Sequence, residues 1–151
     1  MMVVNAPLDE EKLKNLLAEV RENVESLRPF ADMTEADFRK EGNNYAITEH
    51  HFRRALEGVL TIGTHLLSRL PAKTNDYQEV IVSLGKHGVV PEEFAAQNRK
   101  LAGYRNRLVH LYWEISDKEL HDVIKRHLGD LEQFCAYFVK YIGEKRNLGE
   151  K

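Results

Sequence analysis

Cysteine is nearly absent from this chain of 151 residues, which contains only Cys135. A single cysteine cannot form a disulfide within the chain, so a disulfide-stapled fold is excluded and a reducing cytoplasm is the expected compartment. Cys135 falls inside a strongly helical pattern. We therefore expect it to be buried in packing rather than to act as a nucleophile.

Long apolar runs are also missing. No stretch approaches the ~18 residues that a membrane-spanning helix needs, so no membrane segment is expected. Residues 1–8 lack a basic region followed by an apolar core, so we expect no secretory signal peptide. No segment sustains the apolar–polar alternation of a β-strand. The chain is therefore expected to be all-α.

An excess of positive charge is lacking as well. The formal net charge is −2 and the pI is about 6.4. A protein that coats RNA or DNA without regard to sequence is usually basic, so this balance argues against such a role. It leaves room for a small, locally basic cleft. With 42% hydrophobic and 30% charged residues, the chain is predicted to be globular.

Proline is rare, and we expect it to mark helix boundaries. Apolar residues recur at helical spacing after Asp9, a candidate N-cap, and Pro29 is expected to end that helix. Thr34 opens a short element. A long helix is predicted over 46–70, stopped by Pro71.

Three further helices are predicted over 75–85, 91–110 and 116–142. The first is capped by Asn75 or Asp76 and ended by Gly85-Lys-His-Gly88 as a glycine C-cap, and the last is capped by Ser116 or Asp117. The predicted fold is an antiparallel helical bundle of about five helices that forms a dimer. Residues 1–8 are interpreted as a flexible N-terminus, 9–142 as a single helical domain, and 143–151 as a polar C-terminal tail.

The most chemically specific segment is Arg105-Asn-Arg-Leu-Val-His110-Leu-Tyr112. It places a guanidinium, a carboxamide, an imidazole and a phenol within eight residues. Arginine and histidine together suffice for metal-free phosphodiester chemistry, because one stabilises charge on the phosphate and the other moves a proton near neutral pH. Arg105 and His110 are therefore the candidate catalytic residues.

On a continuous helix the apolar stripe comprises Phe94, Leu101, Tyr104, Leu108 and Leu111. Asn106 and His110 are four residues apart and share a face roughly opposite that stripe, whereas Arg105 and Tyr112 lie at its margin. Outward polar groups beside an arginine suggest a cleft shared with a second copy of the chain. We expect three nearby side chains to attract phosphate and contact RNA, namely those of Arg99, Lys100 and Arg107.

A structural interpretation of the same residues stays open. Arginine and histidine near a helix C-terminus are favoured by the helix dipole without any catalytic role. Asn106 then becomes a solvated helix residue, and Tyr112 a core aromatic whose hydroxyl lies at the rim.

Metal and cofactor motifs are not found. The seven histidines do not form HExxH or Cys/His spacing, and His121 and His127 are six apart, which directs them differently on a helix. Gly85-Lys-His-Gly88 lacks the Walker spacing of a phosphate loop. We expect neither a metal site nor a cofactor.

The pattern Arg105-x4-His110-x-Tyr112, with Asn106 directly after the arginine, resembles the signature of the HEPN superfamily. More narrowly, it resembles the HepT-like toxins encoded beside a minimal nucleotidyltransferase. The similarity runs roughly from Ala46 to Ile142, and it includes the 85–90 turn and the closing amphipathic helix.

This resemblance implies a homodimeric, metal-independent endoribonuclease toxin that cleaves tRNA or mRNA. In that scheme His110 acts as general base or acid, Arg105 stabilises the pentacoordinate transition state, and Asn106 orients the histidine or the phosphate. A cognate nucleotidyltransferase antitoxin would transfer AMP from ATP to Tyr112 and so block the phosphate site.

A second function is compatible with the same fold. The chain is then a non-catalytic subunit of a nucleotidyltransferase complex, in which Arg105 and His110 hold a nucleotide or a partner instead of cutting RNA. The RNA target and the neighbouring gene are not determined by the sequence.

Overall fold

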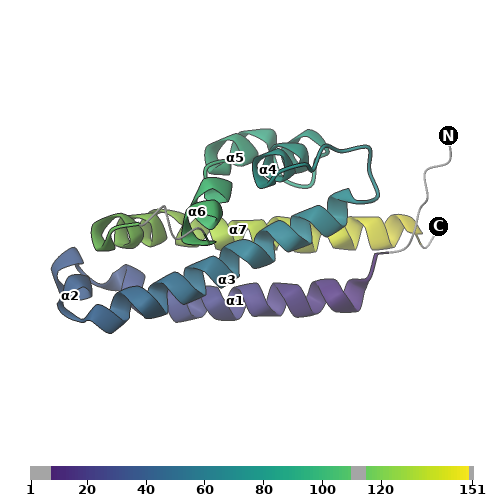
Figure 1. Ribbon diagram of the computed structural model, residues 1–151. Helices are drawn as coiled ribbons and strands as arrows, with labels where there is room; N and C mark the ends of the chain where they lie inside the picture. Colours follow the sequence, from purple (N-terminus) through teal and green to yellow (C-terminus); the bar gives the residue numbers. More distant parts are fainter. Residues whose placement is uncertain (1–7, 110–114, 150–151) are drawn as a thin grey trace.

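The computed structural model describes residues 8–109 and 115–149, and all regular secondary structure within them is helical (Figure 1). The helices in these ranges are α1 Glu10–Asp32, α2 Glu35–Lys40, α3 Gly42–Leu67, α4 Tyr77–Lys86, α5 Glu92–Asn98, α6 Leu101–Val109 and α7 Asp117–Gly149. The all-α prediction is confirmed. The expected number of about five helices was too low, because α2 is a helix of its own and the predicted 91–110 helix is divided into α5 and α6.

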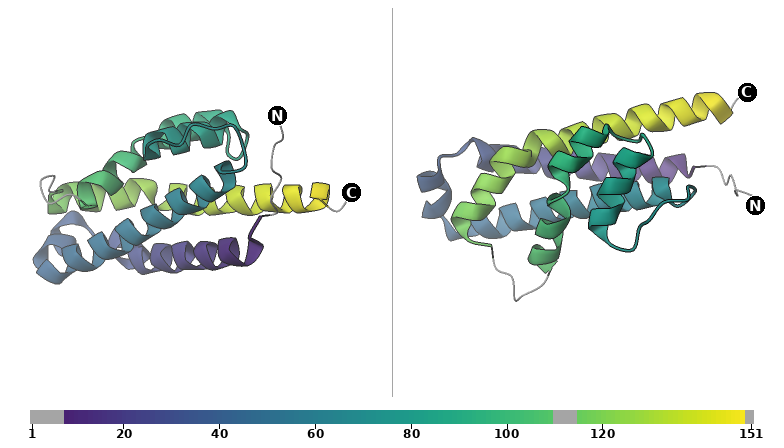
Figure 2. Two further views of the ribbon diagram at one scale, coloured as in Figure 1. Left: turned by 45° about the vertical axis from the view of Figure 1, so that its right-hand side comes forward. Right: turned by 90° about the horizontal axis from the view of Figure 1, so that it is seen from above.

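The core lies among the long helices α1, α3 and α7, which pack on one another. Its largest fully buried side chains include four aromatic rings, from Phe38, Phe52, Phe134 and Phe138. α1 runs opposite to α3, as an antiparallel bundle requires, but α7 runs in the same direction as α3 (Figures 1 and 2). The prediction of a purely antiparallel bundle is therefore wrong for α3 and α7. α4, α5 and α6 carry the chain back along the bundle before α7 begins.

Side-chain caps begin four of the helices where the sequence indicated. Asp9, Thr34, Asp76 and Ser116 each accept a hydrogen bond from the backbone N–H three residues later, at 2.8–3.1 Å. Each bond satisfies one of the N–H groups that a helix start leaves without an internal partner. These caps depend on neighbouring residues alone, so the sequence located each helix start to within one or two residues. The structure selects Asp76 over Asn75 and Ser116 over Asp117.

Proline was a poorer guide to where helices end. α1 continues through Pro29 to Asp32, and α3 ends at Leu67, four residues before Pro71. Pro29 lacks an N–H and so removes one hydrogen bond close to the helix end, a local cost. Burial of Ala31 and packing of Phe30 on the core hold the last turn in place.

The turn after α4 is a glycine C-cap, as predicted. Gly88 has φ of 73°, a left-handed conformation that residues with a Cβ rarely adopt. The N–H groups of Val89 and Val90 both bond the carbonyl of Leu84, at 2.9 and 3.2 Å. This turn reverses the chain so that α5 returns against α4.

The segment interpreted as a C-terminal tail begins within a helix. α7 continues past Ile142 to Gly149, and Arg146 bonds both carboxylate oxygens of Glu10, at 2.9 and 3.0 Å. This contact joins the end of α7 to the start of α1. None of the helices in the described ranges is long and apolar enough to cross a membrane.

Two glycines of α3 allow other helices to approach closely. A Cβ at Gly58 would overlap the side chain of Val20 on α1, and one at Gly63 would lie 3.0 Å from Leu84 on α4. These approaches set the positions of α1 and α4 against α3.

We expect Gly58→Ala to destabilise the fold, because fully buried Val20 must shift to admit the new methyl group. Overpacking of this kind typically costs ~1–3 kcal/mol, which exceeds the gain in helix propensity. Gly129→Ala is the matched control, because Gly129 is an exposed position of α7 and nothing lies within 4 Å of its Cβ position. Urea unfolding should show a lower free energy for the first variant and a slightly higher one for the second. Equal stabilisation by both would show that the α1–α3 contact has room to spare.

Candidate active site

The predicted 91–110 helix is interrupted at its centre. α5 ends at Asn98, whose side-chain Nδ2 donates to the carbonyl of Phe94 at 2.9 Å. Such a bond competes with the backbone ladder and favours a helix end. Arg99 and Lys100 form the turn and are exposed, and α6 starts at Leu101. The turn gives α6 a direction of its own, so helix periodicity counted from Pro91 does not carry across it.

Packing of α6 decides which side chains face outward. Leu101 and Ala102 are buried, and Tyr104 packs between Phe52 of α3 and His127 of α7, at ring-centroid distances of 6.3 and 6.4 Å. With that face covered, Asn106 is exposed. The outward direction predicted for Asn106 therefore agrees with its position.

Arg105 lies partly buried beside α4. The centre of its guanidinium is 4.7 Å from the ring centroid of Tyr77, the first residue of α4, and its Nη1 donates a long bond of 3.4 Å to Oδ1 of Asn106. Its Nε is buried and has no hydrogen-bond partner within the part of the chain that the structure describes. Across residues 8–109 and 115–149, no carboxylate forms an ion pair with it. Stacking fixes the guanidinium while leaving its charge available to an anion.

Arg107 is held very differently from Arg105. Its two terminal nitrogens bond the two carboxylate oxygens of Glu119 on α7, at 2.6 and 2.8 Å, and its guanidinium lies 5.9 Å from the Tyr104 ring centroid. The hydrogen bond to Arg107 lowers the pKa of Glu119, and the reciprocal bond raises the pKa of Arg107. A bidentate pair of this kind is geometrically specific. It ties the end of α6 to the beginning of α7.

The segment between these two helices carries the other half of the candidate site. His110 and Tyr112 lie outside the described residues, so the structure does not place them. Their chain neighbours are placed: Val109 ends α6, and the carbonyl of Ile115 accepts a hydrogen bond from the hydroxyl of Tyr45 at 2.5 Å. Val109 therefore belongs to α6, and Ile115 is bonded to α3.

Two histidines and the cysteine of α7 are held by packing or hydrogen bonds in the helical bundle. His121 stacks on Phe38 at 4.8 Å, and burial lowers the pKa of His127, which bonds Asp130 at 2.9 Å. Cys135 is buried as predicted, and burial raises the pKa of its thiol. Within the described part of the chain, no cluster of three or more histidine, cysteine or acidic side chains is arranged to hold a metal ion.

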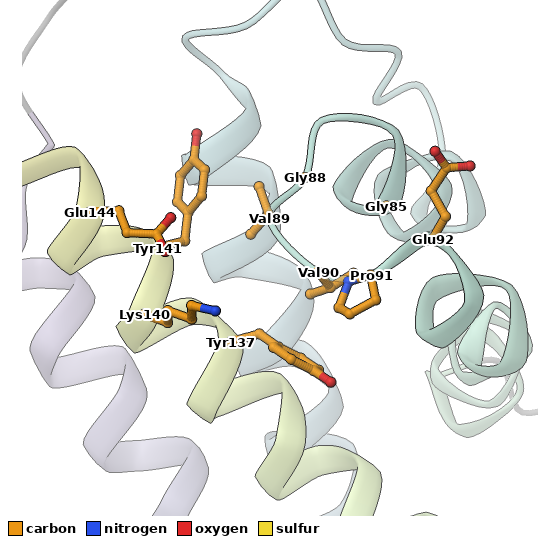
Figure 3. Close-up of a pocket in the computed structure, with 10 residues that line it drawn as sticks. All are labelled: Gly85, Gly88, Val89, Val90, Pro91, Glu92, Tyr137, Lys140, Tyr141 and Glu144. Atoms are coloured by element: carbon orange, nitrogen blue, oxygen red, sulfur yellow. The ribbon is translucent and has the colours of Figure 1, made fainter. Parts of the chain in front are cut away.

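A pocket of about 320 Å³ lies between the 85–92 turn and α7 (Figure 3). Tyr137, Lys140 and Tyr141 of α7 form one wall. The opposite wall comes from the turn, including the side chains of Val89, Val90 and Pro91. The N–H groups of Gly88, Val89 and Val90 already bond carbonyls within the turn, so these three backbone donors are not free to hold a phosphate.

Comparison with known proteins gives the chain a family. Residues 20–138 match the family described as ribonuclease HepT-like. This match covers well over half of the chain. The protein belongs to the HepT-like family. The matched range includes all of α6 and the whole of the Arg105–Tyr112 motif.

Relatives of this HepT-like chain agree with the assignment. A tRNA nuclease HepT from Aphanizomenon flos-aquae is 29% identical over 120 residues, which cover 79% of this chain and 82% of that protein. Among solved structures, YutE of Bacillus subtilis, a cytosolic protein of unknown function, has a TM-score of 0.78 at 21% identity and covers 91% of this chain and 93% of that one.

Two further structures with the same fold are toxin–antitoxin complexes. A tri-AMPylated HEPN toxin from Shewanella oneidensis, bound to an MNT antitoxin, has a TM-score of 0.74 at 18% identity and covers 85% of this chain and 96% of its own. A toxin–antitoxin structure containing AMP-PNP has a TM-score of 0.74 at 17% identity, with coverage of 85% and 97%.

Two side chains near the HepT-like motif were missed by sequence reasoning. Tyr77 stacks on Arg105 from another helix, and Glu119 pairs with Arg107 from a third. Tyr77 is 28 positions from Arg105, and no spacing rule connects them. The spacing of Glu119 from Ser116 indicates the start of a helix, but it does not predict the pairing of Glu119 with Arg107.

The Arg107–Glu119 pair should contribute measurably to stability. Both side chains are about a third exposed, so a double-mutant cycle with Arg107→Ala and Glu119→Ala should give a coupling of ~0.5–1 kcal/mol. Because the folded state lowers the Glu119 pKa, the contribution is present above the usual carboxyl value of 4.5. It is lost as the pH falls through the lowered pKa.

Urea unfolding near pH 7 and near pH 3 measures this coupling. The exposed Arg126–Asp122 pair on α7 is the control, and its coupling should be smaller because both side chains are more than half exposed. A coupling for Arg107–Glu119 that is the same at both pH values would contradict the assigned origin.

Proposed function

We propose that this HepT-like protein is a metal-independent endoribonuclease toxin that cleaves tRNA or mRNA. Arg105 and His110 are its catalytic residues, and they act at a cleft formed between two copies of the chain. The observation that carries the proposal is the set of contacts that Arg105 makes. Its guanidinium is held on Tyr77, has no carboxylate partner in the described residues, and precedes His110 by five positions.

The proposed chemistry follows from these two groups. His110 removes the proton of an RNA 2′-hydroxyl, whose oxygen attacks the adjacent phosphorus and forms a new P–O bond. The bond from phosphorus to the 5′-oxygen breaks, and that oxygen takes up a proton. Arg105 stabilises the additional negative charge on the phosphoryl oxygens. Asn106 lies beside Arg105 and orients the phosphate or the histidine. Membership of the HepT-like family and the name of the 29% identical tRNA nuclease support RNA as the substrate.

Exposed groups around α6 fit the remaining parts of the proposal. Arg99 and Lys100 are exposed and supply charge that attracts RNA, whereas Arg107 shares its charge with Glu119. Val109 is a large apolar residue with 41% of its surface exposed at the end of α6, next to His110. We place the contact between the two copies there, which brings both motifs to one cleft.

The proposal extends to regulation by a partner. A cognate minimal nucleotidyltransferase antitoxin transfers AMP from ATP to the hydroxyl of Tyr112 and releases pyrophosphate. The added phosphate is an anion two residues after His110, where it competes with RNA for Arg105. The similar fold of a tri-AMPylated HEPN toxin in complex with an MNT antitoxin supports this part of the proposal.

The nuclease proposal is tested by RNA cleavage in the presence of EDTA. Arg105→Ala should lower the rate about 100-fold or more, as loss of a preorganised charge-stabilising group does, and His110→Ala should do the same. Arg126→Ala and His50→Ala, both at exposed positions, should leave the rate unchanged. Cleavage that survives both motif substitutions overturns the mechanism. ATP or AMP binding without any RNA turnover would instead favour the non-catalytic subunit.

The regulatory part has its own measurement. Intact-mass analysis after co-expression with the neighbouring nucleotidyltransferase should show added AMP units in the wild-type chain. Tyr112→Phe removes the hydroxyl that accepts AMP, so these additions should disappear. Tyr137→Phe, a partly buried position on α7, should leave them in place. Absence of any mass shift in the wild type counts against the antitoxin mechanism but not against nuclease activity.

A further inference from the structure

A second pocket is lined in part by Tyr77, the residue on whose ring Arg105 stacks. It has a volume of about 640 Å³, within the usual range for sites that hold a small molecule. It lies where the start of α1, the C-terminal part of α3 and the start of α4 meet. Its polar lining comes mainly from Lys12, Thr64, His65, Ser68, Asn75 and Asp76, and Tyr77 also lines it.

The lining offers hydrogen bonds rather than net charge. The hydroxyls of Thr64 and Ser68 donate to backbone carbonyls at 2.8 and 2.7 Å, which leaves their oxygens as acceptors. Nε2 of His65 is buried, and no described residue forms a hydrogen bond with it. Burial lowers the pKa of this histidine, so its ring is neutral near pH 7. Lys12 contributes one positive charge to the lining, and the Asp76 carboxylate contributes one negative charge.

Tyr77 connects this pocket to the candidate active site. Its ring lies under the Arg105 guanidinium at 4.7 Å, and the same residue forms part of the pocket lining. The bond from the Asn75 N–H to Glu79, at 3.0 Å, and the Asp76 cap hold the loop that places Tyr77 there. Tyr77 is therefore shared between the Arg105 contact and the pocket lining.

We propose that this pocket binds the nucleobase of an RNA nucleotide whose phosphate is held by Arg105. The inference rests on the proposed ribonuclease function and adds a determinant of sequence preference to it. A base offers one aromatic surface and an edge of donors and acceptors, and unstacked RNA bases are recognised by aromatic rings and by hydrogen bonds along that edge. Tyr77 supplies the ring, while His65, Thr64 and Asn75 supply the polar edge.

The same lining argues against a phosphate inside the pocket. The Asp76 carboxylate repels an anion, and Lys12 only balances it. Acceptor oxygens on Thr64, Ser68 and Asp76 favour instead a base that carries an exocyclic amino group. Adenine and cytosine have such a group and uracil does not. The pocket is therefore expected to bind adenine or cytosine more tightly than uracil.

Binding of non-cleavable RNA tests this directly. The probes are 2′-O-methyl oligo(A), oligo(C) and oligo(U), in which the attacking hydroxyl is blocked, and fluorescence polarisation gives the Kd of each. Oligo(A) or oligo(C) should bind about tenfold more tightly than oligo(U), the effect of roughly one well-formed hydrogen bond. Thr64→Val and Asn75→Ala, at exposed positions, and His65→Leu should each reduce that ratio. Gln133→Ala and His50→Leu, at exposed positions outside the pocket, should keep it.

Arg105→Ala separates recognition of the base from recognition of the phosphate. It should weaken binding of all three oligonucleotides by a similar factor and preserve the ratio of their Kd values, since a phosphate contact does not distinguish one base from another. Equal Kd values for the three probes in the wild type overturn the inference. So does a wild-type ratio that the three pocket variants leave unchanged.

The cleavage assay distinguishes this inference from the proposed function. If the wild type cuts RNA in EDTA, sequencing of the ends should show a base preference that Asn75→Ala and Thr64→Val weaken. Cleavage with an unaltered preference in these variants overturns the base pocket and leaves the nuclease intact. If no cleavage occurs but the oligonucleotide ratio still falls in the variants, the pocket stands and the nuclease proposal fails.

Discussion

Burial of α3 is the constraint on which the rest of this structure depends. This helix contacts α1, α2, α4, α6 and α7, so it is the common reference for every element that carries a candidate functional group. Two of its close contacts are at glycines, where a Cβ would overlap Val20 at Gly58 and would lie 3.0 Å from Leu84 at Gly63. Because α4 and α6 both rest on α3, Tyr77 and Arg105 can be held face to face although they belong to different helices.

Two arginines two residues apart show how tertiary contacts divide similar side chains between different tasks. Arg107 is matched by a carboxylate and joins α6 to α7, whereas Arg105 is held by an aromatic ring and pairs with no carboxylate among the described residues. An aromatic face positions a guanidinium without neutralising it, unlike a carboxylate. A site meant for a phosphate needs the second arrangement, and a connection between helices benefits from the first.

Under the proposed function, the slight negative charge of this HepT-like chain implies local rather than extended contact with RNA. A net charge of −2 does not favour extended contact with a polyanion. Around α6, however, Arg99, Lys100 and Arg105 lie close together in sequence, and the Tyr77 ring on which Arg105 stacks also lines a near-neutral polar pocket. Under the proposed function, a few positioned groups and one base pocket would replace a broad basic surface. This arrangement suits an enzyme that engages a short, unpaired segment of RNA.

Helix caps and turns could be predicted from the sequence, whereas contacts between helices could not. The all-α class, the caps at Asp9, Thr34, Asp76 and Ser116, and the glycine turn at Gly88 each depend on residues a few positions apart, so spacing alone predicted them. The break after Asn98, the shared direction of α3 and α7, and the Tyr77 ring beneath Arg105 depend on which surfaces meet once the core is packed. Hydrophobic burial does not depend on how far apart residues are in the sequence. These three features were therefore decided only by the tertiary structure.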